Sequence, residues 1–134
     1  MNDDRFDLWS KAALIQVAVT GILGIGCLAI PAPLLTLFGC TPHAGTVVFF
    51  RAFGAALLFV AAIHLALRRS RDASVVRAIA VANLLEDGLL AIFSVHATLT
   101  GAFGSMGWAL VAAFGAEVAF NAWIWSRYRE AAPA

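Results

Sequence analysis

The segment 75–99, VVRAIAVANLLEDGLLAIFSVHATL, decides the fold because it is long and apolar yet carries acids at its centre. A helix of about 20 mostly apolar residues is long enough to cross a bilayer. Near the middle lie Asn83, Glu86 and Asp87, although a carboxylate in hydrocarbon costs about 2.5–3.5 kcal/mol on insertion scales. We therefore expect a membrane-spanning helix whose polar residues face the interior of a helical bundle.

Three more segments of similar length and composition lie at 9–30, 46–67 and 106–126. The chain is 62% hydrophobic and 13% charged, whereas soluble domains are about 45–50% apolar and about 25% charged. The four spans use most of the 134 residues, which predicts a single membrane domain over 1–134. The predicted fold is all-α, an antiparallel bundle of four transmembrane helices.

The connection 31–45 is apolar as far as Gly39 but too short to span a membrane. It opens with Pro-Ala-Pro, and proline suits a first helical turn while glycine suits a helix end. We expect a short interfacial helix at the outer surface, which could also cover the bundle as a lid. Cys27 and Cys40 lie near this side, where a disulfide is permitted, so a bridge and two separate thiols both stay open.

Basic residues gather before the first span, around the connection 68–74 and after the fourth span, whereas 31–45 and 100–105 contain no Lys or Arg. The positive-inside rule places both termini and 68–74 in the cytoplasm. Aromatic rings near span ends are typical of the interfacial belt. These rings are Trp9, Trp108, Trp123, Trp125 and Tyr128.

Each span has one small or polar face, because residues three, four and seven positions apart share a helix face. The first span offers Gln16, Thr20, Gly24 and Cys27, and the second Arg51, Gly54, Ala55 and Ala62. The third offers Asn83, Glu86, Asp87 and Ser94, and the fourth Glu117 and Asn121 with Phe114 and Trp125 close by. Small residues let membrane helices approach closely and polar ones bond across the interface, so we expect these faces to point inward.

A rise of about 1.5 Å per residue puts Glu86, Asp87 and Glu117 near mid-membrane and brings Asn83 and Asn121 to one level nearer the cytoplasm. Arg51 lies in the outer third of its span. Side chains lean toward the N-terminus of their helix, so Arg51 and Glu117 lean the same way and are predicted to pair. With three acids against one cation, at least one acid should be protonated or cation-bound.

Three interpretations of this polar centre stay open. It can bind a small, largely apolar ligand of lipid, isoprenoid or quinone type, or it can catalyse an acid–base isomerisation, cyclisation or epoxide opening. It can also be a hydrogen-bonded core of a structural or accessory subunit. The candidate ligand contacts are Arg51, Asn83, Phe114, Asn121 and Trp125, and the candidate catalytic groups are Glu86, Asp87, His96 and Glu117.

A metal site and a cofactor are not predicted. His64 and His96 lie near opposite ends of their spans, and His43 with His96 would supply only two ligands. A carboxylate metal site at the three acids is the alternative, but the Glu-x-x-His pattern of di-iron bundles is absent. The net charge of +1 and the lack of a basic, aromatic-rich patch predict no nucleic-acid partner. The expected partners are membrane lipids and the apolar ligand, and a homo-oligomer is a possible assembly.

About a third of the chain forms one recognisable run. It consists of a Gly-rich first span followed by Pro31-Ala-Pro33, Leu37-Phe38-Gly39 and Phe50-Arg51-Ala-Phe53-Gly54. This run resembles small bacterial four-span proteins of the DoxX-like type. The resemblance implies a four-span fold and a bacterial inner-membrane location. DoxX itself is linked to quinone-coupled sulfur oxidation, but this chain shows no residues that carry that chemistry over.

Overall fold

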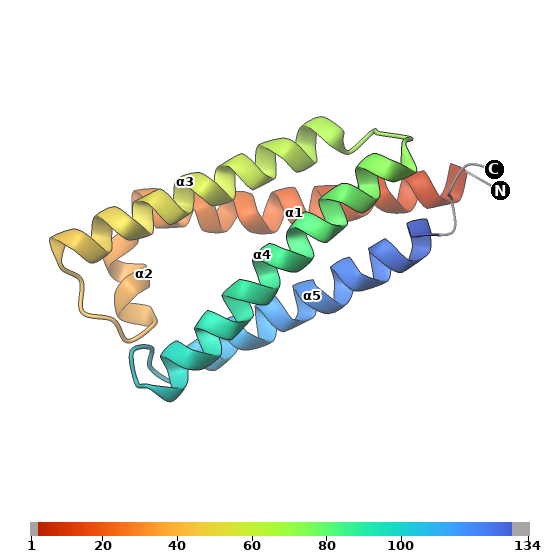
Figure 1. The fold of residues 1–134 in the computed structure, drawn as a ribbon. Coiled ribbons are helices and arrows are strands. Elements are labelled where there is room, and N and C mark those ends of the chain that lie inside the picture. Colours follow the sequence, from red (N-terminus) through yellow and green to blue (C-terminus); the bar gives the residue numbers. More distant parts are fainter. Residues whose placement is uncertain (1–2, 130–134) are drawn as a thin grey trace. The chain divides into compact units, whose positions relative to one another are not determined.

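The structure is a computed structural model that describes residues 3–129, apart from the side chains of residues 3, 5 and 129. Within this range it contains five α-helices and no strand, which confirms the all-α class (Figure 1). The helices are α1 (Asp3–Ala29), α2 (Pro31–Leu37), α3 (Ala44–Leu67), α4 (Ala73–Leu99) and α5 (Gly107–Arg129).

Four of these helices are long and apolar enough to cross a membrane, over Phe6–Ala29, Ala44–Leu67, Ala73–Leu99 and Gly107–Tyr128. They agree with the predicted spans to within a few residues and fit an integral, multi-pass membrane protein. The short helix expected after the first span is α2. Its interfacial position and its role as a lid stay predictions.

The chain forms two compact units, Met1–Arg69 and Ser70–Ala134, which are described separately. In the first hairpin, α1 packs antiparallel against α3, with α2 at the turn between them (Figure 1). In the second hairpin, α4 packs antiparallel against α5. The prediction of one membrane domain over the whole chain stays open.

The first hairpin is held by a close backbone contact between α1 and α3. A Cβ atom added to Gly54 would lie 2.7 Å from Cys27 Cβ and 2.8 Å from the carbonyl oxygen of Gly24. Only hydrogen fits at this crossing, as in other close contacts between membrane helices. The inward face predicted for α1 is correct, since its four residues are all buried: Gln16, Thr20, Gly24 and Cys27.

The face predicted for α3 is partly wrong. Gly54 is buried as expected, but Ala55 and Ala62 are exposed. The buried face of α3 consists of Gly54, Leu57, Ala61 and His64. Small and apolar residues occur all round this helix, so residue size alone does not mark the side that contacts α1.

The position of Trp9 near a span end predicted a ring in the lipid-facing belt. The structure instead buries this ring. The side chain of Trp9 is 3% exposed, and Nε1 donates a hydrogen bond to the carbonyl oxygen of Leu67 at 3.0 Å. That carbonyl is one of the four at the end of α3 that have no partner within the helix. His64, also buried, stacks obliquely on Trp9 with ring centroids 6.1 Å apart, and its Nδ1 lies 2.9 Å from the carbonyl oxygen of Val60.

Glycine ends α2 as its position in the sequence predicts. Gly39 has φ 79°, its N–H bonds to the Thr36 carbonyl at 2.9 Å, and the Cys40 N–H bonds to the Leu35 carbonyl at 2.9 Å. This pair of bonds is the Schellman ending of a helix. Cys27 and Cys40 are both thiols, and burial raises the pKa of Cys40.

Two side chains cap the N-termini of α3 and α4. His43 Nδ1 accepts from the Thr46 N–H at 3.3 Å, while the His43 N–H donates to Thr46 Oγ1 at 3.0 Å. Asp72 Oδ1 accepts from the N–H of Ser74 at 2.8 Å and from its hydroxyl at 2.7 Å. These bonds to Ser74 lower the pKa of Asp72.

Candidate functional site

A chain of side-chain hydrogen bonds crosses from α4 to α5 in the middle of the second hairpin. Asn83 Nδ2 donates to Asn121 Oδ1 at 3.1 Å. Asn121 Nδ2 donates in turn to Asp87 Oδ2 at 3.2 Å. We call these three residues the polar ladder. The level shared by Asn83 and Asn121 was predicted from the sequence and is confirmed.

Asn121 is the fixed centre of the polar ladder. Besides its bond to Asp87, its Nδ2 donates to the carbonyl oxygen of Glu117 at 3.0 Å, so both amide hydrogens are in use. The side chain is 3% exposed. Because an unsatisfied buried amide costs about 1–3 kcal/mol, these bonds hold the Asn121 side chain in one orientation.

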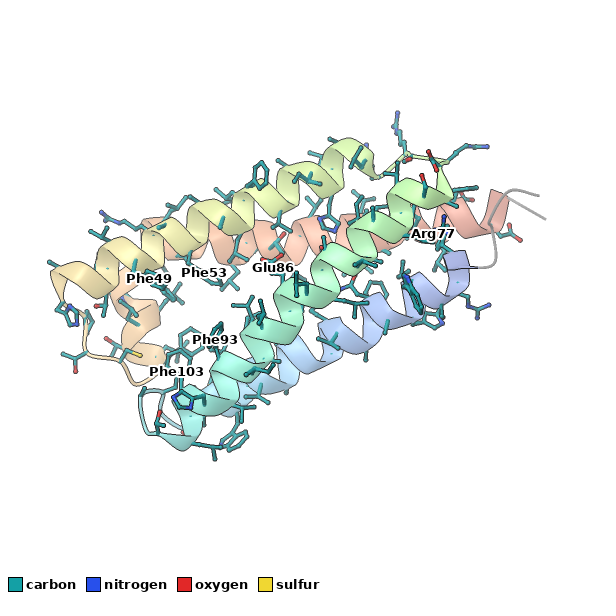
Figure 2. The ribbon with its side chains drawn as sticks, in the orientation of Figure 1. Phe49, Phe53, Arg77, Glu86, Phe93 and Phe103 are labelled. Carbon is teal, nitrogen blue, oxygen red and sulfur yellow. The ribbon has the colours of Figure 1, made fainter. Side chains whose placement is uncertain are left out.

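Three carboxyl groups lie around the polar ladder. Asp87 is 7% exposed, whereas Glu86 and Glu117 are half-buried. Glu86 and Glu117 are both close enough to Asp87 to interact with it electrostatically. Glu86 projects from the middle of α4 (Figure 2). The structure thus brings together the three acids that the sequence analysis selected.

The remaining candidate residues differ in how they relate to this site. Phe114 and Trp125 are half-buried on α5. His96 is exposed and lies nine positions after Asp87, or about 14 Å along α4. The prediction that His96 accepts a proton during catalysis on an apolar substrate stays a prediction, and at this distance His96 could do so only at another part of that substrate than the one beside the acids.

Arg51 is exposed on α3, contrary to its predicted burial. A long guanidinium side chain near a helix end can extend toward a polar boundary while its stem stays on apolar surface. Arg51 and Glu117 belong to different hairpins, so their pairing stays a prediction. The same holds for His43 with His96, and His43 already serves as the cap of α3.

Sequence reasoning missed a close contact near the α4–α5 turn of the second hairpin. Gly107, the first residue of α5, lies so close to the Thr98 side chain that an added Cβ would overlap it. The signal available was a glycine at a predicted span start. Among the described residues, no three His, Cys, Asp or Glu side chains lie close enough together to hold a metal ion.

Comparison of the chain with protein-family models, with curated proteins and with solved structures found no match. The resemblance to DoxX-like proteins therefore stays a prediction.

Proposed function

We propose that this membrane protein binds a small, largely apolar molecule of lipid, isoprenoid or quinone type through the acids of the second hairpin. The observation that carries the proposal is the buried Asp87, held by Asn121 with Glu86 and Glu117 beside it. Intramembrane acids are costly and commonly mark a functional site. The polar ladder fixes Asp87 in place, while the half-buried Glu86 and Glu117 are the groups that a ligand can reach.

The arrangement of donors and acceptors favours one kind of polar head. Asn121 donates both of its amide hydrogens to groups within the hairpin. The three acids therefore offer more oxygen acceptors than the hairpin has donors for. A head that donates hydrogen bonds, such as a hydroxyl or an amine, suits this site. A phosphate or carboxylate head would be repelled by those of the acids that are ionised. An oxidised quinone has no hydrogen-bond donor, so a prenol or quinol fits this site better.

A matched pair of probes tests this proposal. The thermal midpoint of the detergent-solubilised protein is measured with geranylgeraniol and with its acetate ester, which lacks the hydroxyl donor. Only the alcohol should raise the midpoint, and a concentration of 100 times Kd corresponds to about 2.7 kcal/mol. Glu86→Gln should weaken the effect, while His96→Gln, about 14 Å away along α4, should not. Equal shifts with alcohol and ester would contradict a donor-selective site.

Acid–base catalysis is the second candidate, because Glu86 and Glu117 both act electrostatically on Asp87. Neighbouring carboxyl groups can serve as the proton donor and the proton acceptor in an isomerisation, cyclisation or epoxide opening of an apolar substrate. Phe114 and Trp125 could stabilise positive charge in that substrate. Turnover of an isoprenoid epoxide that Asp87→Asn abolishes in a folded protein would favour this candidate over binding alone.

We also propose a bacterial inner-membrane location with both termini in the cytoplasm, supported by the uneven distribution of basic residues. Single cysteines placed at Thr41 and Ser70, in a Cys27→Ala, Cys40→Ser background, test the orientation. A membrane-impermeant thiol reagent applied outside the cell should label position 41 only. Labelling of position 70 from outside would refute it.

A further inference from the structure

At the end of α5, an arginine is held on the ring of a tryptophan. Arg127 lies one helical turn after Trp123, and its Cζ is 5.6 Å from the centroid of the Trp123 ring. Arg127 is exposed and Trp123 is 39% exposed. Stacking on an aromatic face attracts the guanidinium and leaves the N–H groups at its edge available, so that a phosphate or carboxylate can accept two bonds at once.

We expect the Arg127–Trp123 pair at the depth of the membrane boundary, because the candidate span of α5 ends at Tyr128. Arg127 follows Asn121 of the polar ladder by six residues, which is about 9 Å along the helix, and α5 ends at Arg129. Tryptophan rings concentrate at the level of lipid head groups. Arg77 precedes Asn83 by the same six residues on the antiparallel α4 (Figure 2), so a second cation is found at this depth.

No carboxylate of these two helices neutralises this end of the hairpin. Residues 118–129 of α5 and 73–83 of α4 contain no Asp or Glu. The neighbouring acid Asp72 caps α4 through Ser74 and keeps its negative charge, which acts on Arg77. In the sequence around this end, the arginines Arg71, Arg77, Arg127 and Arg129 outnumber the acids Asp72 and Glu130, so the net charge is positive.

We propose that Arg127, oriented by Trp123, binds the phosphate of an anionic glycerophospholipid such as phosphatidylglycerol. The site selects a phosphate by geometry as well as charge, because guanidinium forms a planar pair of hydrogen bonds that an ammonium group does not. It is separate from the acid centre of the second hairpin, which would repel such a head group.

Replacement of Arg127 by lysine distinguishes specific binding at this site from general electrostatic attraction, because lysine keeps the charge but not the planar guanidinium. The thermal midpoint of the detergent-solubilised protein is followed as phosphatidylglycerol or phosphatidylcholine is titrated. Wild type should respond to phosphatidylglycerol at about tenfold lower concentration than Arg127→Lys, and Arg127→Gln should resemble Arg127→Lys. Arg69→Lys, at an exposed arginine of the α3–α4 connection, is the matched control and should behave as wild type.

Three outcomes would overturn the proposal. If Arg127→Lys matches wild type while Arg127→Gln is weakened, the attraction is diffuse. If Arg69→Lys is weakened as much as Arg127→Lys, no particular arginine is selected. If inorganic phosphate raises the midpoint as far as phosphatidylglycerol does, the site takes a free anion and the lipid assignment fails.

Discussion

The two hairpins have the same antiparallel design but are held together in different ways. In the first, α1 and α3 meet at Gly24 and Gly54, where the absence of side chains lets the backbones touch. In the second, α4 and α5 are joined by the polar ladder of Asn83, Asn121 and Asp87. Lipid supplies little hydrophobic drive for helices to associate, so close packing and hydrogen bonds take its place. The chain thus uses close packing in one hairpin and hydrogen bonds in the other. A substitution in one hairpin can therefore be compared with a substitution in the other.

The largest effect is expected where the polar ladder is broken at its centre. Asn121→Leu removes both side-chain bonds to Asn83 and Asp87 and leaves buried polar groups without this partner. Unfolding in mixed detergent, followed by circular dichroism, should show a loss of about 3 kcal/mol. Asn121→Gln, which keeps the amide, should lose less, and an equal loss would mean that packing rather than hydrogen bonding is at issue.

A smaller effect is expected at the glycine contact of the first hairpin. Gly54→Ala places a methyl group against Cys27 and the Gly24 backbone, and overpacking costs about 1–3 kcal/mol. Gly21→Ala, where an added Cβ meets nothing within 4 Å, is the matched control and should be neutral or slightly stabilising. If both variants behave alike, the close contact does not limit stability.

Trp9→Phe tests the side-chain bond that supplements packing in the first hairpin. Phenylalanine keeps a ring beside His64 but cannot donate to the Leu67 carbonyl, and loss of one such bond costs about 1 kcal/mol. Hydrogen exchange at the last turn of α3 should speed up while exchange in α4 stays unchanged. Unaltered exchange throughout would show that the bond adds nothing.

The smallest effect concerns the cap at the start of the second hairpin. The pKa of Asp72 is lowered by its bonds to Ser74, so the folded state favours the carboxylate. This contribution is fully present above the ordinary aspartate pKa and is lost as pH falls through the lower folded value. Thermal midpoints between neutral and acid pH should therefore fall more for wild type than for Asp72→Asn. Parallel curves would contradict the role of the cap.

The sequence predicts the second hairpin better than the first, for a physical reason. In α4 and α5 the polar residues are rare, and each is costly in lipid, so Asn83, Asp87 and Asn121 mark the buried face directly. In α3 most residues are small or apolar, and the contact face through Leu57 and Ala61 has no distinguishing mark. Counting residues gives the depth of a side chain along a membrane helix, but it does not tell which side of the helix that side chain lies on. For this reason Trp9 was expected to face lipid.

The buried position of Trp9 also gives the protein an intrinsic fluorescent probe of its first hairpin. The other three tryptophans, Trp108, Trp123 and Trp125, are all on α5, and Trp9 alone belongs to the first hairpin. Its indole donates to a carbonyl and lies beside an imidazole, so its emission should change when α3 separates from α1. The difference spectrum between wild type and Trp9→Phe would then follow the first hairpin alone, without any attached dye.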